Sequence, residues 1–117
     1  MEHPMYPEAS RELHRQRQEL APGPAAAFKA FSDSVFADGA LSSKAKDLIA
    51  IAVAHVTQCP YCIRGHTASA LRKGATQQEV MEAIWVAAEM RAGAAYAHSN
   101  LALDTMNQVA AKQSNKA

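Results

Sequence analysis

The feature that most constrains the fold of this chain is its apolar composition, which is rich in small side chains. Hydrophobic residues make up 49% of the 117 residues, but only 6% are aromatic, and alanine supplies much of the remainder. Small side chains suit closely packed helices, whereas β-sheet cores favour aromatic and β-branched residues. A chain of this length typically forms one domain. We therefore predict an all-α fold, with residues 1–117 in a single helical domain.

Capping residues, prolines and glycines divide the chain into predicted helices. They give helices with approximate bounds 11–20, 24–38, 43–58, 60–73, 77–92 and 94–109. Pro24 begins the second helix, and we expect a bend at Gly93 between the last two. The third and fourth helices form a central antiparallel hairpin. Residues 1–9 form an N-terminal arm and residues 111–117 a polar tail.

The segment Leu48–Ala54 is the longest purely apolar run in the chain. It is short enough for a buried strand, but its alternating alanines and its place in a capped segment of helical length favour a helix. Such a helix is apolar on nearly all sides, which one small helical domain cannot fully cover. Together with the alanine-rich segment 87–97, this predicts a homo-oligomer.

Charge and hydropathy argue against two kinds of partner. The chain has 12 Lys and Arg against 11 Asp and Glu, a net charge of +1, and no basic cluster, so we expect no nucleic-acid partner. The longest apolar run is far shorter than the ~20 residues of a membrane-spanning helix. The N-terminal MEHPMYPEAS has no apolar segment of the secretory type, so we expect a cytoplasmic protein with no membrane partner.

The only two cysteines, Cys59 and Cys62, lie in the motif Cys-Pro-Tyr-Cys. A disulfide across two intervening residues closes too short a loop to stabilise a scaffold, so the spacing indicates redox chemistry or a metal site. With Cys59 as N-cap and Pro60 at the first helical position, both sulfurs lie in the positive field of a helix N-terminus. That field favours the thiolate, the reactive form of cysteine. The pair is therefore a candidate catalytic dithiol.

His66 and Asp47 are the candidate groups for moving a proton. His66 follows Cys62 by one helical turn and shares its helix face, so the imidazole can accept the thiol proton. An antiparallel hairpin that turns near Gln58 brings Asp47 within reach of His66. The carboxylate would then orient the imidazole, and Ser69, almost level with Asp47, could extend the network.

Zinc binding is the alternative use of the same residue types. A zinc-binding helical module without turnover could use Cys59, Cys62, His66 and His55 as ligands. These residues crowd into one short segment, whereas structural zinc sites usually join two separated ligand pairs. We therefore favour redox function, with no metal or organic cofactor required. For His55 we favour a structural role.

Three stretches of the sequence carry a family resemblance: Lys46-Asp-Leu-Ile-Ala-Ile-Ala-Val-Ala-His55, Cys59-Pro-Tyr-Cys-Ile-Arg-Gly-His66 and Lys73-Gly-Ala-Thr-Gln-Gln-Glu-Val-Met-Glu-Ala83. Through them, residues 41–104 resemble the alkyl hydroperoxidase D-like / carboxymuconolactone decarboxylase superfamily. The peroxidase branch of that family has an acidic residue twelve positions before the first cysteine, then the cysteine pair and a histidine. The matching residues here are Asp47, Cys59, Cys62 and His66.

The sequence departs from the family pattern at two positions. Asp47 stands where the family usually has a glutamate, and Tyr61 stands where well-studied members carry an additional histidine. The decarboxylase branch generally lacks the cysteine pair. The resemblance therefore favours peroxidase or disulfide reductase activity, with a decarboxylase-like enzyme as a further alternative.

The resemblance also implies a reaction cycle and an assembly. It assigns the reaction with a hydroperoxide to Cys62 and the resolving role to Cys59, in a thiol peroxidase of antioxidant defence. The implied reductant is a dihydrolipoyl or thioredoxin-like dithiol. Single-repeat members of the family look like closed rings, so the predicted homo-oligomer is a hexamer built as a trimer of dimers.

Overall fold

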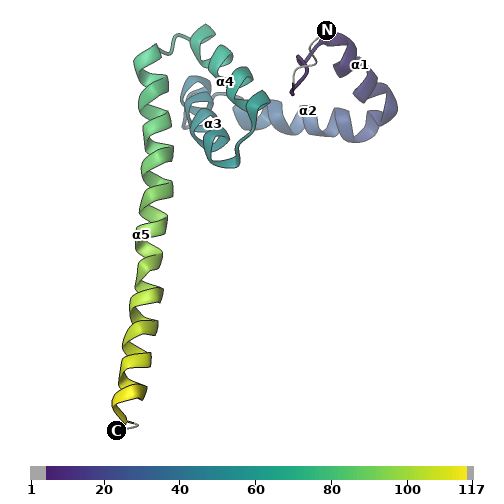
Figure 1. The fold of residues 1–117 in the computed structure, drawn as a ribbon. Helices are drawn as coiled ribbons and strands as arrows, with labels where there is room; N and C mark the ends of the chain where they lie inside the picture. Colours follow the sequence, from purple (N-terminus) through teal and green to yellow (C-terminus); the bar gives the residue numbers. More distant parts are fainter. Residues whose placement is uncertain (1–4, 116–117) are drawn as a thin grey trace.

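The computed structural model describes residues 5–115, which form five α-helices (Figure 1). Their bounds are α1 Arg11–Leu20, α2 Pro22–Phe36, α3 Ser43–Thr57, α4 Pro60–Arg72 and α5 Gln77–Asn115. No strand occurs among these described residues, which confirms the predicted all-α fold. Residues 1–4 of the predicted arm and 116–117 of the predicted tail lie outside the described residues.

The helices start at the predicted capping residues. Ser10 accepts a hydrogen bond from the third residue of α1, and Ser42 does the same for α3. Before α5, the Thr76 hydroxyl accepts from the Glu79 N–H at 3.0 Å, and the Glu79 carboxylate accepts from the Thr76 N–H at 2.9 Å. This reciprocal pair is a capping box. Local side-chain chemistry therefore determines where these helices begin.

Helix α2 begins at Pro22, earlier than the predicted start at Pro24. The first N–H groups of a helix have no intrahelical acceptor, so prolines in the first turn cost no hydrogen bond. Pro22 and Pro24 therefore both lie in the first turn of α2. The helix also ends earlier than predicted, at Phe36, and the Asp38 carboxylate instead accepts a hydrogen bond from the Ser43 N–H at 2.7 Å.

Helix α5 is a single helix of 39 residues, so the predicted bend at Gly93 is wrong. A glycine inside a helix costs only about 1 kcal/mol relative to alanine, and the neighbouring alanines favour continued helix. The helix also runs past Val109, the predicted end, and includes residues 111–115 of the predicted tail. Although α5 is long, no helix within residues 5–115 is both long and apolar enough to cross a membrane.

Helices α3 and α4 form the predicted antiparallel hairpin, and α5 packs against α3 (Figure 1). The chain turns at Gln58, whose φ of 59° and ψ of 53° lie in the left-handed region. The apolar core lies between the hairpin and the beginning of α5. It consists of Ile51, Ala70, Ala75 and Val80, with Leu48 and Ile84 packed against them.

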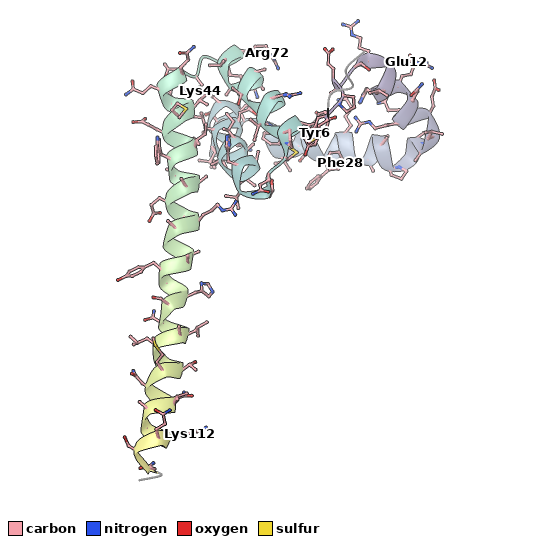
Figure 2. All side chains as sticks on the ribbon, in the orientation of Figure 1. Tyr6, Glu12, Phe28, Lys44, Arg72 and Lys112 are labelled. Atoms are coloured by element: carbon pink, nitrogen blue, oxygen red, sulfur yellow. A yellow bond between two sulfur atoms is a disulfide. The ribbon has the colours of Figure 1, made fainter. Side chains whose placement is uncertain are left out.

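Much apolar surface remains uncovered outside this core. The C-terminal part of α5 projects away from the hairpin, and its side chains point into solvent (Figure 2). The molecule therefore extends over 71 × 35 × 34 Å. Trp85 on α5 is 69% exposed, and Ile49 and Val53 on α3 are about half exposed. The prediction that α3 is apolar on more sides than the monomer covers is thus confirmed.

We expect Ile51→Ala to destabilise the protein by about 2–5 kcal/mol, because it removes a large side chain from the core and leaves a cavity. Ile51 is 0% exposed. Leu20→Ala is the control, since Leu20 is 86% exposed and its truncation should cost under about 0.5 kcal/mol. Denaturant unfolding followed by circular dichroism measures both. Equal effects of the two variants would contradict the assigned core.

Candidate active site

The cysteine pair lies at the turn of the hairpin, where α4 begins. Cys59 is the N-cap of α4, and its sulfur accepts a hydrogen bond from the Cys62 N–H at 3.3 Å. The two Cα atoms are 5.3 Å apart, and the side chains form a disulfide. Pro60 occupies the first helical position, where no N–H is needed. Cys59 is half-buried and Cys62 is exposed, so the pair is open to solvent.

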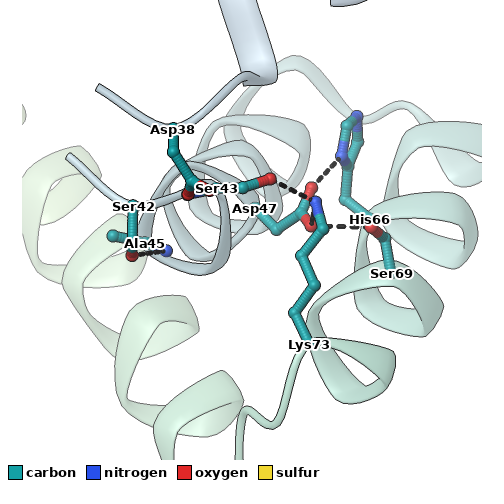
Figure 3. A network of polar contacts seen from close by, with 8 residues as sticks. All are labelled: Asp38, Ser42, Ser43, Ala45, Asp47, His66, Ser69 and Lys73. Atoms are coloured by element: carbon teal, nitrogen blue, oxygen red, sulfur yellow. Dashed lines mark hydrogen bonds and ion pairs between the residues drawn. The ribbon is translucent and has the colours of Figure 1, made fainter.

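Asp47 and His66 meet across the hairpin, at the register that its geometry predicts. Asp47 Oδ1 lies 2.9 Å from His66 Nδ1 (Figure 3). A carboxylate oxygen only accepts, so Nδ1 carries the proton and the free lone pair of the neutral ring is on Nε2. The aspartate therefore reaches the imidazole, although it is one methylene shorter than the glutamate usual in the family that the sequence resembles.

Two more donors bind the other oxygen of Asp47. The Ser69 hydroxyl and the Lys73 Nζ each donate to Asp47 Oδ2 at 2.7 Å, and Lys73 Nζ also donates to Ser43 Oγ at 2.6 Å (Figure 3). Ser69 is part of the predicted network, but Lys73 is not. Lys73 lies one helical turn beyond Ser69, so extending the same hairpin register by one turn would have indicated it.

The environment of Asp47 favours its ionised form. The side chain is almost fully buried, with 1% of its surface exposed. Burial alone would raise the pKa of the Asp47 carboxyl, but hydrogen bonds from Lys73, His66 and Ser69 outweigh it and hold the pKa below its usual value. The site therefore contains a buried carboxylate with donors on both oxygens.

Phe36 is a site residue that the sequence reasoning missed. Its ring stacks on the His66 imidazole, with ring centroids 4.8 Å apart and an angle of 26° between the planes. Phe36 is the last residue of α2, outside the hairpin, and no local pattern links it to His66. Together with Asp47, it restricts the orientation of the imidazole from two sides.

The cysteine pair and the Asp47 network lie on the same helix but are not directly bonded. His66 follows Cys62 by one turn, which places both on one face of α4. No hydrogen bond joins His66 to either cysteine in the described part of the chain, where both sulfurs are held in the disulfide.

His55 does not join this network. Its Nδ1 lies 2.7 Å from the carbonyl oxygen of Ile51 in its own helix, α3. This contact agrees with the structural role favoured from the sequence. Among residues 5–115, no group of three or more His, Cys, Asp and Glu side chains is placed to hold a metal ion.

Tyr61 connects the cysteine motif to the N-terminal segment. Its hydroxyl donates to the carbonyl oxygen of Pro7 at 2.8 Å, and its ring meets Tyr6 edge-on with centroids 6.0 Å apart. A surface hollow of about 650 Å³ lies beside it, lined also by Leu13 and Leu20. Residues preceding α1 thus border the cysteine motif.

Comparison with known proteins gives consistent matches. The model of the carboxymuconolactone decarboxylase family matches residues 22–105. "Uncharacterized protein 4 in cox locus" from Paracoccus denitrificans is 65% identical over 83 residues, which is 71% of this chain and 75% of that protein. An uncharacterized protein from Cupriavidus necator is 37% identical over 102 residues, covering 82% of this chain and 90% of its own.

Two solved structures share the fold. A protein from Methanobacterium thermoautotrophicum has a TM-score of 0.67 at 37% identity, covering 71% of this chain and 93% of that one. A carboxymuconolactone decarboxylase family protein from Legionella pneumophila, solved in its apo form, has a TM-score of 0.62 at 35% identity. That match covers 68% of this chain and 70% of the other. The match over residues 22–105, which include the hairpin and its cysteine motif, places this chain in the carboxymuconolactone decarboxylase family.

Proposed function

We propose that this protein is a thiol-dependent peroxidase or disulfide reductase, in which Cys62 reacts with the substrate and Cys59 resolves the product. One observation carries the proposal. Two cysteines within disulfide distance lie at the start of α4. His66 follows Cys62 by one turn of the same helix, and the buried carboxylate of Asp47 holds its ring. The exposure of Cys62 gives a hydroperoxide or a partner disulfide access to its sulfur.

The proposed cycle has three steps. The Cys62 thiolate attacks one oxygen of the hydroperoxide, the O–O bond breaks, and Cys62 becomes a sulfenic acid while an alcohol or water leaves. The Cys59 thiol then attacks the sulfenic sulfur, which forms the disulfide and releases water. An external dihydrolipoyl or thioredoxin-like dithiol reduces this disulfide and is itself oxidised. Overall the hydroperoxide is reduced, the external dithiol supplies both electrons, and no metal or organic cofactor takes part.

His66 carries the proton in this cycle. Because its Nδ1 faces Asp47, its Nε2 accepts the proton of the Cys62 thiol and returns it to the leaving oxygen. Asp47 touches neither sulfur, so it is a positioning residue that acts through the imidazole.

The cysteine pair should form a reversible disulfide in solution. After mild peroxide treatment of the reduced protein, mass spectrometry should show the loss of two hydrogen atoms from one peptide that contains Cys59 and Cys62. Cys59→Ser should instead accumulate a sulfenic acid at Cys62 that dimedone traps, and Cys62→Ser should not. Persistent free thiols, or adducts formed only between chains, would contradict the cycle. Zinc bound through both thiols in protein purified without chelator would favour the zinc-binding alternative.

His66→Ala should slow peroxide reduction by about 10²-fold or more and raise the apparent pKa of the reactive thiol, because the proton acceptor is lost. Asp47→Asn should cause a smaller change in the same direction. Asp47→Glu should bring no gain, since the aspartate already reaches His66. Alkylation rates of the reduced protein and peroxide consumption, both measured against pH, test this.

His55→Ala is the matched control for His66→Ala, because the same substitution removes a ring bonded only within its own helix. It should leave the rate and the pH profile unchanged. Equal losses in the two histidine variants would show that neither ring has a specific role.

The functional unit that we propose is a homo-oligomer, a hexamer built as a trimer of dimers. The exposed apolar side chains of α3 and the projecting α5 support it, since a second copy can cover both. Light scattering at micromolar concentration should give about six times the 12.6 kDa chain mass. A monomer mass would reject the oligomer, and a dimer alone would reject the ring.

A further inference from the structure

We propose that Lys73 is a positioning residue whose ammonium group neutralises Asp47 and so disfavours a proton on the His66 imidazole, which leaves the ring able to accept one. The inference rests on the proposed function in taking His66 as the proton carrier. It adds the residue that caps the end of α4, which the cycle above does not use.

The geometry places Lys73 and His66 on opposite oxygens of one carboxylate. Lys73 Nζ is 2.7 Å from Asp47 Oδ2, and His66 Nδ1 is 2.9 Å from Asp47 Oδ1. The carboxylate is buried, while the side chains of Lys73 and His66 are each about one-third exposed. Lys73 is further held by Ser43 Oγ at 2.6 Å, so its ammonium group is fixed between the first turn of α3 and the end of α4.

The charges of Asp47 and Lys73 act on the His66 ring in opposite directions. A buried carboxylate facing a histidine alone favours the charged imidazolium, because the pair is then neutral. An imidazolium cannot accept a proton from a thiol. With Lys73 in place, the ammonium already neutralises Asp47, and a proton on His66 would give the cluster a net charge of +1. Lys73 therefore disfavours the imidazolium.

One more carboxylate belongs to this network: Asp38 accepts from the Ser43 N–H at 2.7 Å, and it is unchanged in the variants compared below. Helix α3 contributes Asp47, and the end of α4 contributes Lys73. From α2, the group in contact with the His66 ring is Phe36, which carries no charge. On its own helix, Cys62 is one turn away and does not titrate when it is held in the disulfide. The oxidised protein thus isolates the influence of Lys73.

The test is an NMR titration of the His66 ring in the oxidised full-length protein, with labelled histidine. Lys73→Gln keeps a hydrogen-bond donor but removes the charge, so it should raise the His66 titration midpoint by about one pH unit. Lys73→Arg keeps the charge and should restore the midpoint. Lys44→Gln is the matched control, because Lys44 pairs with Glu79 at 3.3 Å rather than with Asp47. It should leave the midpoint unchanged.

A midpoint in Lys73→Gln that is unchanged or lower would overturn the proposal, since a purely hydrogen-bonding role predicts no upward shift. If Lys73→Gln fails to fold, Ser43→Ala removes one hydrogen-bond acceptor of the Lys73 ammonium group but keeps its charge. The His66 midpoint should then rise by a smaller amount, and an unchanged midpoint in Ser43→Ala would also overturn the proposal. In the reduced protein, the acid limb of the peroxide-reduction profile should shift with the midpoint in Lys73→Gln. If peroxide reduction itself is absent, the proposed function fails, while the titration still decides the role of Lys73.

Discussion

The buried carboxylate of Asp47 is the interaction on which the rest of the structure depends. An ionised group with 1% exposure is tolerated only when donors replace the lost water, and α4 supplies them through His66, Ser69 and Lys73. The same contacts hold α3 to α4 and orient the imidazole. Removing one of these donors leaves the buried carboxylate with fewer partners and therefore destabilises the fold. The hydrogen bonds around Asp47 therefore stabilise the fold and orient His66 at the same time.

The contribution of Asp47 to stability depends on pH in a defined direction. Because the pKa of Asp47 is lowered in the folded state, its ionised form stabilises the protein fully above the pKa of an unfolded aspartate. That contribution is lost as the pH falls through the lowered folded value, where the carboxylate takes up a proton. The contact that orients His66 weakens over the same range. Acid therefore weakens the hairpin and the orientation of the imidazole together.

Periodicity, caps and hairpin register predicted the parts of the structure that depend on neighbours along the chain. They placed Asp47 opposite His66 and level with Ser69, and they identified Cys59 as a helix cap. They could not identify Phe36, because the packing of α2 on the hairpin is a tertiary contact without a local signal. The predicted bend at Gly93 failed for a related reason. A single glycine is a weak helix breaker when alanines on both sides favour the helix.

In the proposed cycle, α4 separates the redox step at the two cysteines from proton transfer at His66. Cys59 is the cap, whose carbonyl accepts the first helical hydrogen bond from the Ile63 N–H at 3.0 Å, and Cys62 is in the first turn. Both sulfurs therefore lie at the start of α4. The other end of α4 is anchored to α3 through Lys73, which binds both Asp47 and Ser43. His66 lies between these two ends and is held by Asp47 on one side and Phe36 on the other. The imidazole can therefore keep one orientation in both the dithiol and the disulfide form, as the proposed cycle requires of its proton carrier.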